Sequence, residues 1–246
     1  MRQLRGDLTK KYSGVALIFG ATSAIGLAVT RKYLNSDYRV IGVGHENLAA
    51  LRDEMSKEKR LIAHRCNFAS ERSLQGLINK LPLPDITAFV NLSAYTRKCG
   101  LAGSSVSELK GAICVSAITN YYTLGSLLPW FINARRGRIV IGSSIGVQYG
   151  GAPANFLYSW SLHAREFIPA EALDAAKNNV LINVIRIGVT DTPQLRRRKK
   201  DLGERIKLIP AGRMAHPEEI ANVITWLGSE ANSFVTGQVI AAAGGE

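Results

Sequence analysis

The sequence predicts an α/β fold in which a doubly wound, seven-stranded parallel sheet forms a single domain. Short runs of consecutive apolar residues alternate with segments of helical periodicity along the whole chain. Strands that are apolar on both faces are typical of a parallel sheet that helices cover on both sides. The length of 246 residues suits one such domain, and no repeat, linker or break in composition divides it.

Seven apolar runs predict the strands, because aliphatic and β-branched residues favour extended, buried backbone. The first run leads into a glycine-rich turn, and the last run lies close to the final glycines of the chain. In order, the predicted strands are 15–19, 38–43, 61–66, 86–91, 138–142, 180–187 and 238–242.

The intervening segments carry apolar residues at helical spacing, which predicts the covering helices. Their alternation with the strands gives the order from which a doubly wound sheet is built. The predicted helical segments are 25–34, 48–57, 71–81, 106–132, 158–177 and 217–227.

Composition excludes several classes of protein. Hydrophobic residues make up 46% of the chain, which is enough for a sizeable core and does not fit a disordered protein. No apolar run approaches the ~18 residues of a membrane span, and the first residues lack the apolar core of a signal peptide. We therefore expect a cytoplasmic protein that acts away from membranes. The three cysteines show no metal-ligand spacing, so no metal site is predicted, and we expect them to be small core side chains.

A glycine-rich turn between the first strand and the first helix predicts a dinucleotide site. The turn reads Gly20-Ala-Thr-Ser-Ala-Ile-Gly26. Glycines permit a sharp turn and a close approach of the backbone to a pyrophosphate, which the N-terminus of the following helix also attracts. The predicted cofactor contacts in this turn are Gly20, Thr22, Ser23, Ala24, Ile25 and Gly26.

The end of the second strand favours NADP over NAD. A carboxylate at this place would bind the ribose 2′-hydroxyl of NAD and repel the 2′-phosphate of NADP. The sequence has Gly44 and His45 there, and His45 is a candidate contact for the 2′-phosphate. The alternative interpretation is that His45 is a solvated loop residue.

These features resemble the classical short-chain dehydrogenase/reductase family over nearly the whole chain. Residues 19–26 are similar to its TGxxxGxG motif, with Ala24 in place of the middle glycine, and residues 91–94 are similar to its NNAG motif. Residues 183–192 resemble its N-x-x-x-P-G-x-x-x-T pattern, with Ile187 in place of proline. The resemblance implies a Rossmann-type sheet, a nicotinamide cofactor and a homodimer or homotetramer. It also implies cofactor contacts from Asn67, Asn91, Gly188, Thr190 and Thr192.

The family's catalysis uses four residues, and this sequence departs from that pattern. A Tyr acts as general acid and base, a Lys one helical turn later lowers the pKa of the Tyr, a Ser positions the carbonyl, and an Asn supports a proton-relay water. The resemblance places Tyr158 at the Tyr position, Ser116 at the Asn position and Ser144 at the Ser position, with Ser143 as the alternate. The Lys position is Leu162.

A second register of this motif stays open. Counting back without gaps from Asn183 puts Leu157 and Ser161 at the Tyr and Lys positions. Neither register supplies a Lys. The loss matters because a phenol, with a reference pKa of about 10, works at neutral pH only beside fixed positive charge.

Arg165 is the candidate substitute for the missing cation. It lies seven residues after Tyr158, on the same face of the predicted helix, similar to the Tyr-x6-Lys spacing of some divergent enoyl reductases of the family. The alternative, which the position favours, is that Arg165 is a solvated helix charge. His163 is rotated off this face and is a weaker candidate.

The positive charge is concentrated in one segment. The chain has 31 Lys and Arg against 19 Asp and Glu, a formal net charge of +12, which favours an anionic partner. No recognition motif for nucleic acid is present. At about 190–210, where the family has a substrate lid, five consecutive cations could attract phosphate, carboxylate or an acidic carrier protein, or could be a solvated surface. They are Arg196, Arg197, Arg198, Lys199 and Lys200.

Three functions compete at this stage. The first is an NADP-linked reductase or dehydrogenase that acts on the carbonyl or hydroxyl of a small anionic or carrier-linked biosynthetic intermediate. The second is a non-redox enzyme on the same fold, such as a lyase, isomerase, cyclase or dehalogenase-like protein, because a fold does not fix the chemistry. The third is a catalytically silent subunit that binds the cofactor.

Overall fold

The structure is a computed structural model that describes residues 12–45, 48–198 and 202–246. Its seven parallel strands form one sheet in the order β3-β2-β1-β4-β5-β6-β7, which confirms the predicted doubly wound, single-domain fold. The strands are β1 Gly14–Phe19, β2 Tyr38–Gly44, β3 Leu61–Arg65, β4 Ile86–Asn91, β5 Gly137–Ser144, β6 Val180–Ile187 and β7 Val239–Ala242.

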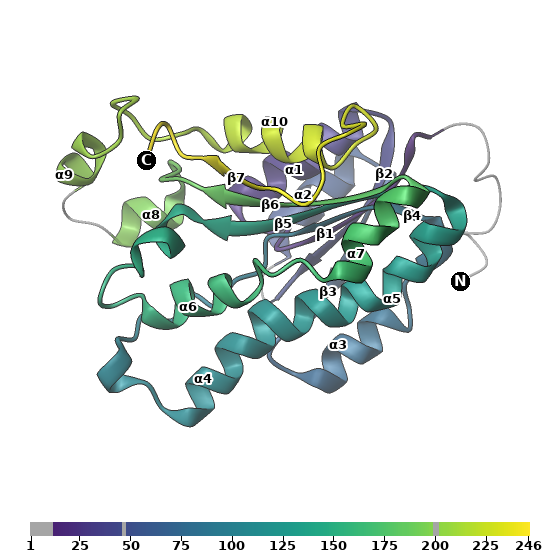
Figure 1. Ribbon diagram of the computed structural model, residues 1–246. Helices are drawn as coiled ribbons and strands as arrows, with labels where there is room; N and C mark the ends of the chain where they lie inside the picture. Colours follow the sequence, from purple (N-terminus) through teal and green to yellow (C-terminus); the bar gives the residue numbers. More distant parts are fainter. Residues whose placement is uncertain (1–11, 46–47, 199–201) are drawn as a thin grey trace.

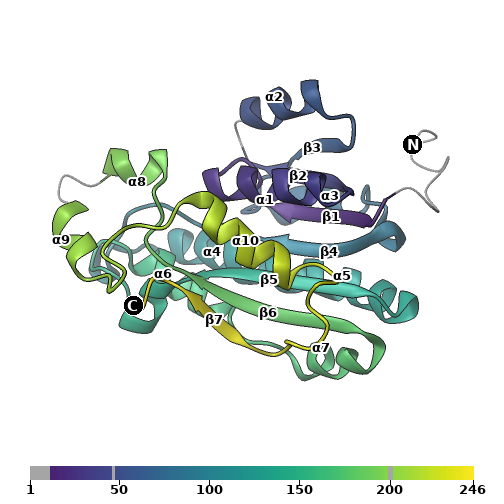
Figure 2. The same ribbon diagram turned by 90° about the horizontal axis from the view of Figure 1, so that it is seen from above.

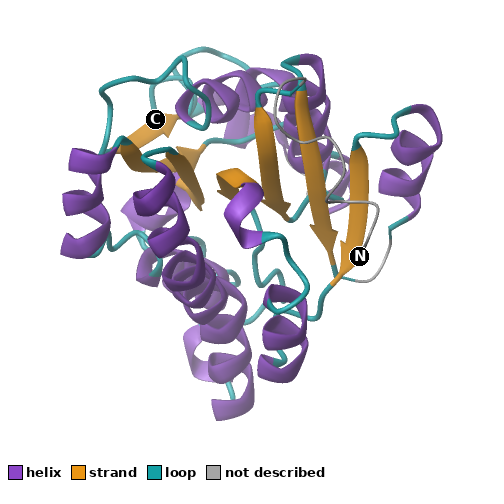
Figure 3. Cartoon of the chain, turned by 90° about the vertical axis from the view of Figure 1, so that its right-hand side faces the viewer, coloured by secondary structure: helices purple, strands orange, loops and turns teal. Residues whose placement is uncertain are grey.

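Helices cover both faces of the sheet (Figures 1 and 3). Among the described residues, no helix is long and apolar enough to cross a membrane. The helices are α1 Ala24–Asn35, α2 Ala49–Lys57, α3 Glu71–Ile78, α4 Val106–Ile113, α5 Thr119–Ala134, α6 Phe156–Ala164, α7 Ala170–Asp174, α8 Pro193–Arg198, α9 Leu202–Lys207 and α10 Pro217–Leu227.

Two apolar clusters hold the layers together. Val29 of α1 packs with α2 and α10 against one face of the sheet, and Leu127 of α5 packs with α3 and α7 against the other face. Apolar surface that is removed from water on both faces explains the continuous apolar strands of the sequence. Cys66 and Cys114 are buried as predicted, whereas Cys99 is only half-buried.

One predicted helix is wrong in extent. The segment 158–177 is not a single helix, because α6 ends at Ala164 and a short connection leads to α7, which begins after Pro169. Proline lacks the N–H of a helix interior and disfavours the helical conformation of the residue before it. The predicted helical segment 106–132 is present, but a π-helical turn at Cys114–Ile118 separates α4 from α5.

The strand order locates the functional end of the sheet. β1 pairs with β2 on one side and with β4 on the other, so the order reverses between β1 and β4. In doubly wound sheets such a reversal leaves a crevice at the carboxyl ends of the strands, where ligands bind. The short helices α8 and α9 lie beyond this end of the sheet, on the same side as the carboxyl end of the chain (Figure 2).

Candidate active site

A cleft of about 1520 Å³ opens at the carboxyl ends of the strands. This volume exceeds the ~300–1,000 Å³ of a typical small-ligand pocket, so it has room for a dinucleotide and a substrate together. The cleft is lined by the glycine turn after β1, the ends of β5 and β6, one face of α6, and α8.

The glycine turn has the geometry that the sequence predicts. Gly20 has a φ of 76°, and a Cβ there would lie 2.7 Å from the backbone oxygen of Leu92, so only glycine fits. Ser23 caps α1, because its Oγ accepts a hydrogen bond from the N–H of Gly26 at 3.0 Å. The N-terminus of α1 therefore faces the cleft, where it suits a pyrophosphate. The turn residues that line the cleft are Gly20, Thr22, Ser23, Ala24 and Ile25.

Gly26 is a correction to the predicted set of direct contacts. It does not belong to the cleft lining; a Cβ there would lie 2.2 Å from the carbonyl oxygen of Gly20. Gly26 is needed because α1 packs closely against its own turn, which is the packing function of the last glycine in such motifs.

The residues at the ends of β2 and β3 border the same cleft. His45 and Asn67, the predicted cofactor contacts in this region, both line it. The Oδ1 of Asn67 accepts a hydrogen bond from the N–H of Ala69 at 3.1 Å, which fixes the loop after β3. The Nε of Arg65 donates to the carbonyl oxygen of His45 at 3.1 Å, so a guanidinium lies beside the end of β2. Sequence reasoning missed Arg65, although a charged residue at the end of a buried strand was a visible signal.

Asn91 is a second correction. It is fully buried behind the cleft wall and does not line the cleft. Its Oδ1 accepts hydrogen bonds from the N–H of Ser93 at 3.1 Å and from the Oγ of Ser93 at 2.7 Å, and its Nδ2 donates to Asn120 at 3.1 Å. Asn91 therefore shapes the turn after β4, and Leu92 and Ser93 of that turn reach the cleft.

The two serines at the end of β5 differ in their hydrogen bonds. Ser143 donates its hydroxyl to the Oε1 of Glu166 at 2.6 Å, so only its lone pairs remain for another partner. Ser144 accepts a hydrogen bond from the N–H of Gly146 at 3.2 Å, which leaves its own O–H available to donate into the cleft. The geometry therefore favours Ser144 over Ser143 as the donor to a substrate oxygen.

Glu166 is an ionised carboxylate beneath the cleft that sequence reasoning missed. Burial alone would raise the pKa of Glu166, but hydrogen bonds from Arg186 and Ser143 outweigh it and lower this pKa. The Oε2 of Glu166 accepts from the Nη2 of Arg186 at 2.7 Å. No sequence motif indicated this contact, because its partners come from β5, β6 and the segment after α6.

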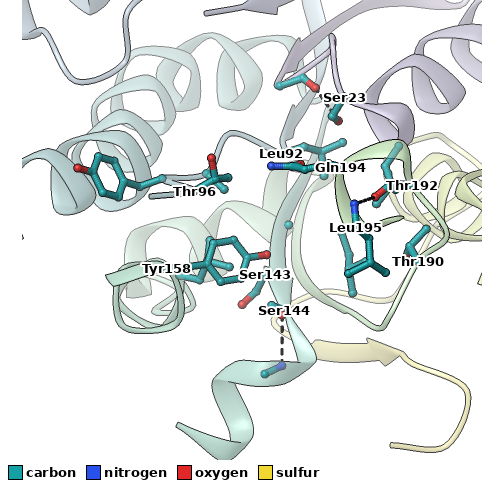
Figure 4. Close-up of a pocket in the computed structure, with 18 of the residues that line it drawn as sticks. Ser23, Leu92, Thr96, Ser143, Ser144, Tyr158, Thr190, Thr192, Gln194 and Leu195 are labelled. Carbon is teal, nitrogen blue, oxygen red and sulfur yellow. Dashed lines mark hydrogen bonds between the residues drawn. The ribbon is translucent and has the colours of Figure 1, made fainter. Parts of the chain in front are cut away.

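Tyr158 reaches the cleft from α6. Figure 4 shows its ring beside Ser143 and Ser144, across the cleft from Thr192 and Leu195. Leu157 of the second register is fully buried and does not line the cleft. The structure therefore places the first register, with Tyr158, at the cleft.

Ser116 is a third correction, because it is fully buried and does not line the cleft. Its Oγ donates to the Oγ of Ser161 at 3.0 Å, and Ser161 in turn donates to the carbonyl oxygen of Tyr158 at 3.2 Å. The two serines occupy the Asn position and one of the two candidate Lys positions. Their hydroxyl groups form hydrogen bonds with each other and with the backbone of α6. The two serines therefore form a hydrogen-bonded pair inside the protein and do not extend to the cleft.

Arg165 is the largest departure from expectation, because the favoured interpretation as a solvated charge is wrong. The side chain is 2% exposed and lines the cleft. Its Nη1 donates to the carbonyl oxygen of Ser93 at 2.5 Å, and its Nε has no hydrogen-bond partner in the described part of the chain. Side chains on a helix point back toward its N-terminus, so a long side chain at the end of α6 reaches the turn that carries Tyr158.

The charge of Arg165 persists in this environment. Burial lowers the pKa of Arg165 to about 10, and the nearby Tyr158, Glu166 and Tyr121 act in the opposite direction. The guanidinium is therefore protonated at neutral pH. The Oη of Tyr121 on α5 lies 3.0 Å from the carbonyl oxygen of Ala164 and 2.9 Å from that of Phe167, which holds the chain on either side of Arg165.

The predicted lid contributes to the cleft in part. Gly188, Thr190 and Thr192 line it, and Thr192 caps α8 by accepting from the N–H of Leu195 at 3.2 Å. Arg197 is exposed and lines the cleft.

Of the other four lid cations, only Arg196 has a described side chain. Arg196 forms an ion pair with Asp191 at 2.5 Å and does not line the cleft. Arg198 is the last residue of α8, and Lys199 and Lys200 lie outside the described residues.

Residues 20–246 match the family model described as enoyl-(acyl carrier protein) reductase. The chain belongs to the classical short-chain dehydrogenase/reductase family. The 3-oxoacyl-[acyl-carrier-protein] reductase of Aquifex aeolicus is 29% identical over 239 residues, which cover 94% of this chain and 96% of that protein. The carbonyl reductase family member 4 of Xenopus laevis is 26% identical and covers 95% of this chain and 98% of that protein.

Solved structures of short-chain dehydrogenases/reductases have the same fold. A 3-oxoacyl (acyl-carrier-protein) reductase from Agrobacterium tumefaciens C58 with NADP bound gives a TM-score of 0.85 at 24% identity, covering 96% of this chain and 95% of that one. A 3-oxoacyl-[acyl-carrier protein] reductase from Brucella melitensis gives a TM-score of 0.85 at 25% identity, covering 96% and 91%. Membership of the family therefore agrees with the sheet order and with the position of the cleft.

Proposed function

We propose that this chain is an NADP(H)-linked carbonyl reductase that acts on an anionic or carrier-linked intermediate. The observation that carries the proposal is that a phenol, a serine hydroxyl and a buried guanidinium line the same cleft as the glycine turn. Relatives whose names specify 3-oxoacyl-[acyl-carrier-protein] reduction, and a structural relative with NADP bound, support the substrate class and the cofactor.

The proposed chemistry assigns one task to each side chain. NADPH, when it is bound on the glycine turn, supplies a hydride to the carbonyl carbon. Ser144 donates a hydrogen bond to the carbonyl oxygen, and Tyr158 gives that oxygen its proton. Arg165 supplies the positive charge that stabilises the phenolate left on Tyr158.

The test is to mix the protein with NADPH and a panel of 3-oxoacyl thioesters, ketones and aldehydes, and to follow nicotinamide absorbance. We expect NADPH consumption that depends on the carbonyl compound. If every compound leaves NADPH unchanged while the protein binds the cofactor, the reductase proposal is wrong. The missing Lys specifically favours a non-redox alternative, in which a substrate changes without any change in nicotinamide absorbance.

We expect His45→Asp to raise the Kd for NADPH by about tenfold and to leave the Kd for NADH nearly unchanged. The new carboxylate would repel the 2′-phosphate, which NADH lacks. Quenching of intrinsic fluorescence measures both constants, and His45→Asn serves as the control of similar size without the charge. Equal effects of His45→Asp on both cofactors would contradict the proposed place of the 2′-phosphate.

We also expect Arg197→Gln to raise the KM for an anionic substrate by about fivefold and to weaken its dependence on ionic strength. Arg197 is the exposed cation of α8 that lines the cleft. Steady-state kinetics at several salt concentrations give the measurement. Lys177→Gln is the matched control, because Lys177 is exposed and pairs with Asp174 of α7, away from the cleft. An unchanged KM and salt dependence would remove Arg197 from substrate binding.

A further inference from the structure

A buried, ionised carboxylate lies beneath the wall of the cleft that carries Tyr158. The side chain of Glu166 is 7% exposed, and it follows directly after Arg165 in the chain. Burial acts to raise the pKa of Glu166, but hydrogen bonds from Arg186 and Ser143 hold this pKa below its ordinary value. The negative charge is therefore present throughout the neutral pH range, and the proposed chemistry has not yet given it a task.

The carboxylate of Glu166 is held in one position by its neighbours. Oε1 accepts from the Oγ of Ser143 at 2.6 Å and from the Nε of Arg186 at 3.0 Å, and Oε2 accepts from the Nη2 of Arg186 at 2.7 Å. Two donors of one guanidinium on one carboxylate give a directional, charge-assisted pair. The Nδ1 of His163 on α6 lies 3.7 Å from Oε2, but this side chain is 70% exposed, so water screens any charge on it.

The fixed carboxylate is linked to the surroundings of Tyr158 in two ways. Ser143, which donates to Glu166, lies beside the ring of Tyr158 (Figure 4). The guanidinium of Arg165 interacts electrostatically with both Tyr158 and Glu166. Arg165 and Glu166 are both buried, and buried charges are screened much less than charges at the surface. The negative charge of Glu166 is therefore felt at the phenol.

The charges of Arg165 and Glu166 act on Tyr158 in opposite directions. A nearby cation favours the phenolate, and a nearby anion favours the neutral phenol. A general acid must keep its proton until the substrate oxygen takes it, whereas the phenolate that remains needs positive charge. A guanidinium without a counter-charge would serve only the second need, so a buried carboxylate beside it balances the two.

We propose that Glu166 keeps Tyr158 protonated before the reaction by offsetting the positive charge of Arg165. Glu166 acts through its neighbours and does not touch the substrate, so it is a positioning residue. This inference rests on the proposed function, in which Tyr158 is the acid. The alternative is that Glu166 and Arg186 only tie the segment after α6 to β6. In that case, removing the charge of Glu166 would not change the pH at which Tyr158 loses its proton.

The test is a spectrophotometric pH titration of the protein without substrate, because a phenolate absorbs in the near-ultraviolet at longer wavelength than a phenol. Subtracting the titration of the same protein with Tyr158→Phe isolates Tyr158 from the other tyrosines, including Tyr121 near Arg165. We expect Glu166→Gln to move the ionisation of Tyr158 to lower pH by about one pH unit. The amide keeps the shape of the side chain and removes the charge that offsets Arg165.

Two further variants separate charge from folding. Arg186→Gln removes a cation that offsets Glu166, and we expect it to move the ionisation of Tyr158 to higher pH. A general loosening of this wall would move both variants in the same direction, and that result would contradict the inference. Glu218→Gln removes an exposed carboxylate of α10 and is expected to leave the ionisation of Tyr158 in place.

NADPH oxidation by the same proteins distinguishes this inference from the proposed function. In an active protein we expect the rate of reduction by Glu166→Gln to fall at a pH about one unit lower on the alkaline side. If the unmodified protein reduces a carbonyl compound and Glu166→Gln leaves the titration of Tyr158 unchanged, the inference alone is overturned. If no carbonyl compound is reduced but Glu166→Gln moves this titration to lower pH, the proposed function fails and the electrostatic role of Glu166 stands.

Discussion

Replacing Tyr158 with Phe is expected to lower kcat for carbonyl reduction by about 10²- to 10⁴-fold, the contribution typical of a general acid. The variant keeps the ring that lies beside Ser143 and Ser144, and it removes only the hydroxyl that gives its proton to the carbonyl oxygen. NADPH binding should change little, because the glycine turn and the N-terminus of α1 are untouched. Steady-state NADPH oxidation and a binding titration measure the two effects separately.

Tyr149→Phe is the matched control for this experiment. Tyr149 also lines the cleft, but it is 61% exposed, and its hydroxyl accepts a hydrogen bond from the Nε2 of Gln148 at 3.0 Å. Its removal should leave kcat within about a factor of two, as is usual for an exposed side chain with no special contact. Turnover that survives Tyr158→Phe but not Tyr149→Phe would show that Tyr149, and not Tyr158, supplies the proton.

The fold was predictable because its signals are local. The apolar run of β1, the glycine turn and the cap at Ser23 follow one another within a few residues, and each needs no knowledge of the rest of the chain. Pro169 was a local signal that the predicted helix 158–177 is interrupted. The apolar periodicity of the segment nevertheless favoured one continuous helix. Strand order and helix layers then follow from the handedness of the βαβ crossovers.

The details of the site were less predictable, because they depend on residues that are distant in sequence. The difference between Ser143 and Ser144 is set by Glu166, which lies 23 residues further on. Asn91 and Ser116 occupy motif positions, but the sequence cannot show that their side chains bond inward to Asn120 and Ser161. A motif fixes where the backbone passes, whereas hydrogen-bond partners fix what a polar side chain offers to the cleft.

Arg165 shows why the location of a cation cannot be read from helical spacing alone. Seven residues after Tyr158 is the correct face, and an intact helix would still leave the charge about one turn away. The structure ends α6 at Ala164 and supplies a carbonyl acceptor from Ser93, so the guanidinium is drawn into the wall of the cleft. The burial of this charge depends on the turn after β4. The spacing between Tyr158 and Arg165 carries no information about that turn.

We expect Arg165→Met to lower kcat by about 10²-fold, the order found when one preorganised donor is removed from an active site. A cation near Tyr158 favours the phenolate, so in the alcohol-oxidising direction, where Tyr158 must accept a proton, the rate should rise with pH through the pKa of that phenol. Loss of the guanidinium removes the favourable interaction and raises that pKa. The rising limb of the pH–rate profile of Arg165→Met should therefore lie at higher pH than that of the unmodified protein.

Arg165→Lys separates charge from shape in this experiment. The ammonium keeps the positive charge but loses the forked geometry that reaches Ser93, so we expect kcat between the two other proteins and a pH profile close to the original one. Thermal unfolding should be measured for both variants, because each leaves the carbonyl oxygen of Ser93 without its buried donor. If Arg165→Met is folded and shows an unchanged kcat and an unchanged pH profile, the charge that supports Tyr158 comes from another group, and the buried guanidinium serves only to hold the turn after β4.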